Sequence, residues 1–232
     1  VHQCAVAILV RRLGIAAAFG LLESEVSFFK QSSLPLLDEN FHAILQNDNT
    51  VMYAPDGNGS LFWSFSESGL LDSWKNQGIA YISVCNIDNP LADPFDYEMI
   101  GLLATKQVDF TCGCIKRDDP FEKVGVIVQS DQIPRVVEYS EISEVERTKK
   151  NEDGTFMHPL ANVSIYSFST SFIEHLSQLP KDALPLHRAE KNCTPKQKTG
   201  LLDPSLTSYL KFEYFIFDVF PYAKSGVCLV YD

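Results

Sequence analysis

The stretch that decides the fold is residues 50–84, TVMYAPDGNGSLFWSFSESGLLDSWKNQGIAYISV. A β-branched and aromatic run at 50–53 leads into a glycine-rich turn, and apolar residues then recur at helical spacing over 61–68 and 70–77. A second strand-like run follows at 80–84. Two strands joined by a long helical connection predict an α/β fold, because such a crossover is how parallel strands are connected.

The same alternation of short strands and helices continues along the chain. It predicts an α/β architecture with a mixed, mainly parallel sheet and helices on both faces. The sheet is expected to be mixed because 124–139 is typical of a β-hairpin with its turn at 129–134. The predicted strands are 26–29, 50–53, 80–84, 111–115, 124–128, 136–139, 163–168 and 227–231. The predicted helices are 5–19, 61–68, 70–77, 94–106, 169–178 and 212–223.

Length and composition favour a single packed body over 1–232. The 232 residues are 45% hydrophobic and 21% charged, and no repeat or domain linker interrupts them. The segments 144–154 and 180–204 are charged or rich in proline and are expected at the surface. Because the chain begins at Val1, we expect it to be an interior portion of a longer protein.

Charge and cysteine content exclude several classes of function. The net charge of −11 argues against a broad basic face for nucleic acid or anionic lipid. No apolar run reaches the ~18–20 residues of a membrane span. Six scattered cysteines are too few for a disulfide scaffold, so reduced thiols and a cytoplasmic location are expected. The oligomeric state is not predicted.

The loop 54–60 is the first candidate for ligand binding. In an open α/β sheet, loops that leave the carboxyl ends of strands form the ligand crevice, and glycines there let the backbone approach a ligand closely. Asn58 adds both a donor and an acceptor. An ordinary tight turn explains Asp-Gly and Asn-Gly somewhat better on spacing alone.

Asp88 is the second candidate, at the end of the hydrophobic run 80–89. A carboxylate in this position suits a hard divalent cation, although a turn or cap role is as well supported. Asp93 is a further candidate as a helix N-cap, with Pro94 at the first helical position.

Two later segments are also polar enough to bind a ligand. Glu138, in the run 137–141, can accept hydrogen bonds from a sugar or can be a solvated strand residue. The run KFEYFIFD at 211–218 joins Lys211 to aromatic residues, which at this spacing belong more often to a core than to a ligand platform. The five histidines are scattered, and no nucleophile–base set is evident, which argues against a hydrolase or a zinc enzyme.

In order and spacing, these segments resemble the eukaryotic-type UDP-sugar pyrophosphorylase family, and most closely its UDP-N-acetylglucosamine pyrophosphorylase branch. The branch's Gln-x-x-Leu-Pro motif stands here at 31–35, and its Pro-Asp-Gly-Asn-Gly motif stands at 55–59. The run VVEYSEIS at 136–143 is equally specific. The remaining matches are the strand ending in Asp-Asn at 88–89, a Val-Gly-Val strand with Gly125, Asn162 ahead of a strand, and Lys-x-Glu-x-Phe-x-Phe-Asp at 211–218. The likeness extends over about 14–230.

The resemblance implies a fold, a reaction and a set of site residues. The fold is a Rossmann-like nucleotidyltransferase domain, and the reaction forms a UDP-sugar, here UDP-N-acetylglucosamine, and pyrophosphate from UTP and a sugar 1-phosphate. Mg²⁺ is the implied cofactor, and no covalent nucleophile is needed because such catalysis depends on positioning and charge neutralisation. The implied site residues are Gln31 and Gly57 at the uracil, Asn58, Gly125, Glu138 and Asn162 at the sugar, Phe215 and Phe217 around the N-acetyl group, Lys211 at a phosphate, and Asp88 at the metal.

Departures from the family pattern keep alternatives open. The family's N-terminal glycine-rich nucleotide loop and its C-terminal domain do not occur in these 232 residues, so the resemblance implies the central part of the catalytic domain. One alternative is a UDP-glucose or general UDP-sugar pyrophosphorylase, whose members more often carry His where Asn58 stands. A catalytically inactive UDP-sugar-binding fragment or relative is the other.

Overall fold

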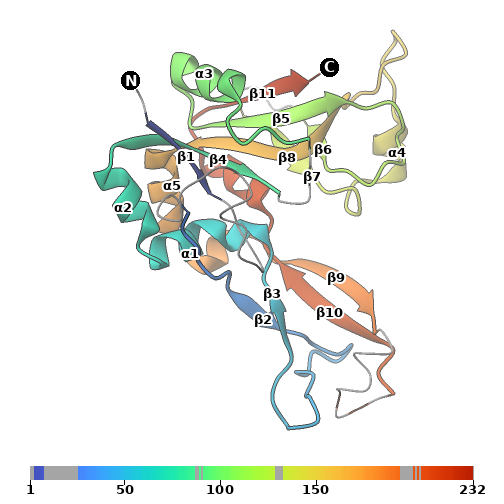
Figure 1. Cartoon of the computed structure of the whole chain (residues 1–232). Coiled ribbons are helices and arrows are strands. Elements are labelled where there is room, and N and C mark those ends of the chain that lie inside the picture. Colours follow the sequence, from blue (N-terminus) through green and yellow to red (C-terminus); the bar gives the residue numbers. More distant parts are fainter. Residues whose placement is uncertain are drawn as a thin grey trace.

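The largest element of the structure, a computed structural model, is a sheet whose strands follow the order β1-β4-β8-β5-β11 (Figure 1). The structure describes residues 3–7 by their backbone alone, and 26–86, 89, 91–128, 133–193, 201, 203 and 205–231 in full. The strands on this path are β1 (Gln3–Ala7), β4 (Ile79–Cys85), β8 (Leu160–Ser169), β5 (Phe110–Lys116) and β11 (Gly226–Tyr231). Strands β6 (Val126–Val128) and β7 (Arg135–Val137) pair with each other, and β6 also pairs with β8.

Strand direction explains why the sheet is mixed. β1 pairs in parallel with β4, and β11 pairs in parallel with β5. β8 lies between β4 and β5 and is antiparallel to both. Four of the five strands on the path therefore share one direction, and the reversed β8 makes the central pairings antiparallel. The predicted hairpin is confirmed, since β6 and β7 pair from Val126↔Val137 to Val128↔Arg135.

Helices cover both faces of the sheet, as the sequence predicts. The helices α1 (Leu61–Glu67), α2 (Leu70–Asn76) and α5 (Thr170–Ser177) lie on one face (Figure 1). The helix α3 (Tyr97–Lys106) lies on the other, where it buries Met99 and Leu103, and Thr111 Oγ1 donates to the Met99 carbonyl at 3.4 Å. The short α4 (Glu144–Thr148) begins at a Ser143 cap in the charged segment near the surface. None of the helices in the described part of the chain is long and apolar enough to cross a membrane.

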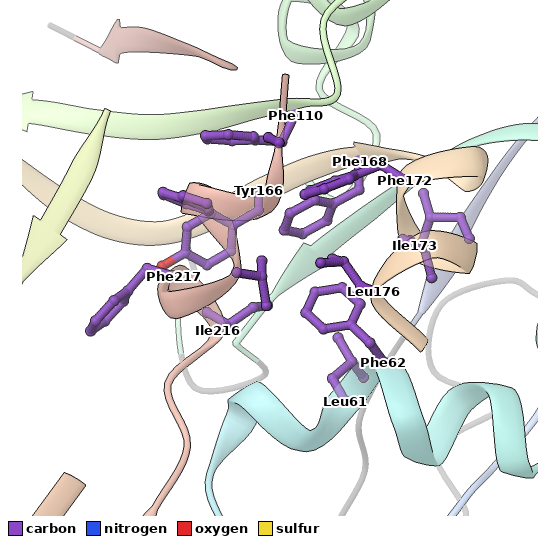
Figure 2. Packing of buried hydrophobic residues seen from close by; sticks show 14 of the residues in the cluster. Leu61, Phe62, Phe110, Tyr166, Phe168, Phe172, Ile173, Leu176, Ile216 and Phe217 are labelled. Carbon is purple, nitrogen blue, oxygen red and sulfur yellow. The ribbon is translucent and has the colours of Figure 1, made fainter. Parts of the chain in front are cut away.

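An aromatic core fills the space between the sheet and α1, α5 and η5 (Ile216–Tyr222), a 3₁₀ helix (Figure 2). Phe110 stacks on Phe220 with ring centroids 4.0 Å apart, and Phe62 meets Phe168 edge-on at 5.3 Å. Burying one such side chain contributes about 1.5–3 kcal/mol. Side chains alternate along a strand, so Cys112 and Cys114 share the core-facing side of β5 with Phe110, and both are free thiols.

Two antiparallel ribbons, which we call the arm, project from this body (Figure 1). They are β2 (Ser33–Pro35) with β3 (Tyr53–Pro55), and β9 (His187–Asn192) with β10 (Ser208–Glu213). Leu37 and Leu210 tie the ribbons together through reciprocal backbone hydrogen bonds of 3.1 and 2.8 Å. A small cluster of Leu36, Ile44 and Leu201 is buried beside them. A short 3₁₀ turn, η4 (Lys181–Ala183), precedes β9.

Two predicted helices are wrong in the part of the chain that the structure describes. Residues Gln3–Ala7 form strand β1, so the predicted helix 5–19 fails at its start, and 8–19 lies outside the described residues. The predicted helix 212–223 is instead the end of β10 followed by η5, in which Pro221 removes a backbone donor. Apolar residues at helical spacing do not distinguish a helix from a buried strand and turn.

Three smaller predictions are also corrected. The predicted strand 50–53 is instead β3, which pairs antiparallel with β2 in the arm and does not lie in one sheet with β4. No strand forms at 26–29, where the Phe29 ring packs on Phe65 at 5.6 Å. Helix α3 begins at Tyr97 rather than at Pro94, because Asp96 Oδ1 accepts from the backbone N–H groups of Glu98 and Met99 at 2.8 and 3.0 Å and so caps it. Asp93 Oδ1 accepts from the Phe95 N–H at 2.8 Å, so Asp93 caps only the turn that precedes α3.

Candidate functional site

The glycine-rich loop after β3, residues 56–59, is hydrogen-bonded to residues 214–216, where β10 leads into η5. The Tyr214 N–H donates to the Asp56 carbonyl at 2.7 Å, and the Gly59 N–H donates to the Tyr214 carbonyl at 2.9 Å. Asn58 Oδ1 accepts from the Ile216 N–H at 2.9 Å. Two segments more than 150 residues apart in sequence are thereby held as one unit.

Gly57 is required by this close approach. Its φ is +91°, and an added Cβ would lie 2.2 Å from the Tyr214 carbonyl oxygen. At Gly59 the added Cβ would lie 2.7 Å from the Phe215 carbonyl oxygen. Neither position admits a side chain. The tight turn and its close packing against the 214–215 backbone together explain why both residues are glycine.

The residues expected at the uracil meet at the root of the arm. The Gln31 side-chain amide donates to the Gly57 carbonyl. The Lys211 ammonium is hydrogen-bonded and ion-paired to the Glu213 carboxylate, and Glu213 Cβ lies 3.0 Å from where a Gly57 Cβ would stand. We call Gln31, Gly57, Lys211 and Glu213 the arm cluster.

The fold gathers three of the residues expected at the sugar in a second place. An added Cβ at Gly125 would lie 3.6 Å from Glu138 Oε2 and 3.7 Å from Asn162 Cβ. These residues stand beside β6, after β7 and in β8, and the Asn162 N–H donates to the Gly125 carbonyl at 2.8 Å. We call Gly125, Glu138 and Asn162, together with the Tyr166 hydroxyl that Asn162 contacts, the sheet cluster.

Asn162 is buried, and neighbouring residues satisfy most of its side chain. Its amide Nδ2 donates to the Tyr166 hydroxyl at 2.8 Å, and its Oδ1 accepts from the Ser164 N–H at 3.1 Å. Ser164 has a φ of +57°, at the point where the pairing of β5 with β8 slips register. Burial raises the pKa of Tyr166 and keeps its hydroxyl neutral.

A small pocket, partly open to solvent, lies at the carboxyl end of β4. Asn58 lines it from the loop, and Ser164 and Tyr166 line it from β8, so it adjoins the sheet cluster. Figure 2 shows Tyr166 beside Ile216 and Phe217. The full lining is Asn58, Leu61, Val84, Cys85, Asn86, Ser164, Tyr166 and Ile216. This position matches the crevice expected at the ends of strands.

Acidic groups and one imidazole border the sheet cluster. His187 Nδ1 lies 2.6 Å from Glu141 Oε1, and its Nε2 lies 2.9 Å from Asp218 Oδ2. Burial alone would lower the pKa of His187, but its contacts with both carboxylates outweigh burial and raise it. Burial raises the pKa of Asp218, and the nearby His187 imidazole offsets only part of this rise. Burial and then the charge of Glu141 raise the pKa of Glu138.

Phe215 and Phe217, in the aromatic run at 211–218, differ in how far they are buried. Phe217 is 7% exposed and belongs to the aromatic core, as the core interpretation of this run predicts. Phe215 is only partly buried, and its ring lies 4.3 Å from that of His187 and 5.1 Å from that of Phe217.

The predicted metal ligand Asp88 lies outside the described residues. Within the described part of the chain, no group of three or more His, Cys, Asp or Glu side chains could hold a metal ion.

Sequence reasoning did not identify Tyr166, Ser164 or His187 as site residues. Tyr166 looks like any core aromatic residue in an apolar strand, and a positive φ at Ser164 has no sequence signal. His187 stands in a segment predicted to be a surface excursion. The VVEYSEIS run was the only signal near its partner Glu141, and nothing in it points to an imidazole 46 residues away.

Comparisons with known proteins show what this chain is similar to. The family described as UTP--glucose-1-phosphate uridylyltransferase matches residues 15–203. A probable UDP-N-acetylglucosamine pyrophosphorylase from Schizosaccharomyces pombe is 37% identical over 212 residues, which cover 88% of this chain and 44% of that protein. A protein of the same description from Dictyostelium discoideum is 34% identical over 215 residues, which cover 91% of this chain and 44% of that protein.

Solved structures give the same picture. A crystal structure assigned as UDP-N-acetylglucosamine pyrophosphorylase from Entamoeba histolytica matches with a TM-score of 0.80 and 31% identity, covering 93% of this chain and 53% of that one. The UDP-N-acetylglucosamine pyrophosphorylase of Trypanosoma brucei matches with a TM-score of 0.74 and 28% identity, covering 93% and 44%. The chain thus spans about half the length of the proteins that it matches, and its nucleotidyltransferase-like fold is confirmed.

Proposed function

Because the chain belongs to the UTP–glucose-1-phosphate uridylyltransferase family, we propose that this protein forms a UDP-sugar and pyrophosphate from UTP and a sugar 1-phosphate. We propose N-acetylglucosamine 1-phosphate as the sugar substrate. The observation that carries the proposal is the meeting of Gly125, Glu138 and Asn162, where Asn162 contacts Tyr166, a residue that lines a pocket together with Asn58. The names of the relatives from Schizosaccharomyces pombe and Dictyostelium discoideum support the choice of sugar.

In the proposed complex the sheet cluster holds the sugar. The Glu138 carboxylate accepts hydrogen bonds from sugar hydroxyls, a task that suits an acceptor-only group. Asn162 uses one amide N–H on Tyr166 and keeps the other for the ligand. Gly125 leaves the space that a side chain would fill between these two residues. The partly buried ring of Phe215 forms a wall toward the N-acetyl group, with Phe217 behind it.

The arm cluster holds the nucleotide in this proposal. Gln31 and the backbone at Gly57 face the uracil, and Lys211 meets a phosphate in exchange for part of its pairing with Glu213. The sugar phosphate oxygen then attacks the α-phosphate of UTP, and pyrophosphate leaves. The residues of this chain contribute by holding the two reactants in line and by neutralising charge.

A divalent cation remains part of the proposal. When bound with the phosphates, Mg²⁺ would shield their negative charge, and Asp88 is its proposed ligand. Asp88 lies outside the described residues. The cytoplasmic location also stays a prediction.

Titration calorimetry of the 232-residue chain with UDP-N-acetylglucosamine, UDP-glucose and UDP, each with Mg²⁺, tests the proposal. We expect all three to bind, with UDP-N-acetylglucosamine preferred. Glu138→Ala should weaken UDP-sugar binding by about tenfold or more, since a hydrogen bond to a charged group contributes about 1.5–3 kcal/mol. Glu152→Ala, in an exposed turn, is the matched control and should change nothing.

Three outcomes would each contradict a different part of the proposal. Unchanged affinity in Glu138→Ala would overturn the sugar site. A preference for UDP-glucose would replace the proposed sugar and keep the reaction. No binding of any of the three ligands, by a chain whose circular dichroism shows it to be folded, would remove the proposed site altogether.

A further inference from the structure

His187 bridges two carboxylates that come from different parts of the fold. It is the first residue of β9, at the root of the arm, where it pairs in register with Glu213. Its two ring nitrogens contact Glu141 at 2.6 Å and Asp218 at 2.9 Å. The imidazole therefore connects the arm, the turn after β7 and the start of η5.

Each carboxylate partner is itself tied to a residue of the proposed sugar site. The Glu141 N–H donates to the Glu138 carbonyl at 2.9 Å, so both belong to one tight turn. Asp218 Oδ2 accepts from the Phe215 N–H at 3.2 Å, and the Phe215 ring lies against the imidazole at 4.3 Å. His187 thus lies between the carboxylate expected at the sugar hydroxyls and the ring expected at the N-acetyl group.

The charges around His187 explain what its loss would do. Glu138, Glu141, Asp218 and the Glu213–Lys211 pair surround it, so acids outnumber bases in this region. An imidazolium donates from both nitrogens and neutralises the space between Glu141 and Asp218. Without it these two carboxylates repel, and the turn carrying Glu138 separates from the segment carrying Phe215.

We propose that His187 is a positioning residue that sets the spacing between Glu138 and Phe215 and thereby makes the site selective for a 2-acetamido sugar over a 2-hydroxy sugar. The inference rests on the proposed function, because it assigns a role within that same site. The His187 side chain contacts Glu141 and Asp218, the two carboxylates tied to the sugar half, so we expect its loss to act mainly on sugar binding.

The test compares dissociation constants of UDP-N-acetylglucosamine, UDP-glucose and UDP for the wild-type chain and three variants. For His187→Ala we expect binding of UDP-N-acetylglucosamine to weaken by about threefold to tenfold, binding of UDP to be unchanged, and the preference over UDP-glucose to shrink by the same factor. Glu141→Gln keeps an acceptor but loses the charge, and should give a smaller loss in the same direction. His175→Ala, an exposed histidine on α5, is the control.

The outcomes separate this inference from the function on which it rests. Wild-type selectivity in both His187→Ala and Glu141→Gln would overturn the inference and leave the proposed function standing. An equal loss for UDP and both UDP-sugars would show a merely structural role and would also overturn it. If the wild-type chain binds none of the ligands, the proposed function fails and this inference fails with it. If thermal melting shows that His187→Ala is unfolded, the milder Glu141→Gln variant decides.

Discussion

The sheet cluster and the arm cluster hold their polar groups in place by different means. In the sheet cluster, polar atoms are buried among strands, and the fold itself supplies most of their hydrogen-bond partners, as it does for Asn162 with Tyr166 and Ser164. In the arm cluster, the side chains are partly exposed, and the Lys211 ammonium pairs with the Glu213 carboxylate two residues away. We therefore expect side-chain changes in the sheet cluster to cost stability, and changes to the Lys211 and Glu213 side chains of the arm cluster to cost little.

The difference follows from where each cluster lies. β8 contacts both β4 and β5 and is buried on the aromatic side, so every polar group in it must find a partner within the protein. The arm consists of two two-stranded ribbons, whose side chains can turn to water. An unpaired polar atom costs little there.

The largest expected loss of stability arises in the arm cluster, at Gly57. Gly57→Ala forces a Cβ to within 2.2 Å of the Tyr214 carbonyl oxygen at a φ of +91°. We expect the free energy of unfolding to fall by about 3 kcal/mol, the sum of overpacking and left-handed strain. Gly154→Ala is the matched control, with a φ of +84° and nothing within 4 Å of the added Cβ, and should cost about 1 kcal/mol. Equal losses in urea unfolding would contradict the proposed interlock.

The second-largest loss of stability is expected in the sheet cluster, at Tyr166. Tyr166→Phe removes the hydroxyl that accepts from Asn162 Nδ2, and leaves a buried amide N–H without its partner. We expect a loss of about 1–3 kcal/mol in the free energy of unfolding. Lys211→Met in the arm cluster, which breaks a partly exposed ion pair, should cost under about 1 kcal/mol. Urea melts of the two variants side by side would refute the distinction if the costs were reversed.

A smaller effect of opposite sign is expected at Ser164. Its φ of +57° strains a residue that carries a Cβ, and glycine adopts this conformation freely. Ser164→Gly should raise the free energy of unfolding by about 1 kcal/mol. The backbone N–H that Asn162 accepts is retained in this variant. A loss of stability would show that the Ser164 side chain matters more than the strain of its backbone.

The smallest effect is the pH dependence of stability around His187. A histidine with a raised pKa contributes stability that is complete below its unfolded pKa of about 6.5 and is lost as pH rises through the folded value. The raised pKa values of Glu138 and Asp218 act in the same direction at lower pH, because their ionised forms are disfavoured. Above about pH 6.5, wild-type stability should fall by under about 1 kcal/mol. His187→Gln should remove that decline, and parallel pH curves would contradict the assignment.

Much of the main sheet could be predicted from the sequence, because its strands are short β-branched runs with turn residues at their ends. β4, β5, β11 and the β6–β7 hairpin lie within a few residues of their predicted positions. The arm could not be predicted in the same way. Its strands β9 and β10 include many polar residues, and they are stabilised by pairing with each other rather than by a buried face.

The residues of the candidate site also differ in whether the sequence alone could predict them. Gly125, Glu138 and Asn162 were found through a family motif, and their meeting in space follows from the pairings of β6 with β7 and β8. Tyr166 and His187 act through contacts with residues on other elements. A single sequence carries no signal for such contacts, since the same side chains occur in many cores and ribbons.

The reversed strand β8 also imposes an order on how the chain assembles. β4 and β5 are made early and point the same way, but their shared neighbour consists of residues 160–169, about 45 residues beyond the end of β5. During synthesis the two halves of the sheet stay unjoined until that stretch has left the ribosome. Because Asn162 and Tyr166 both lie in β8, the sheet cluster can form only after this strand has been made.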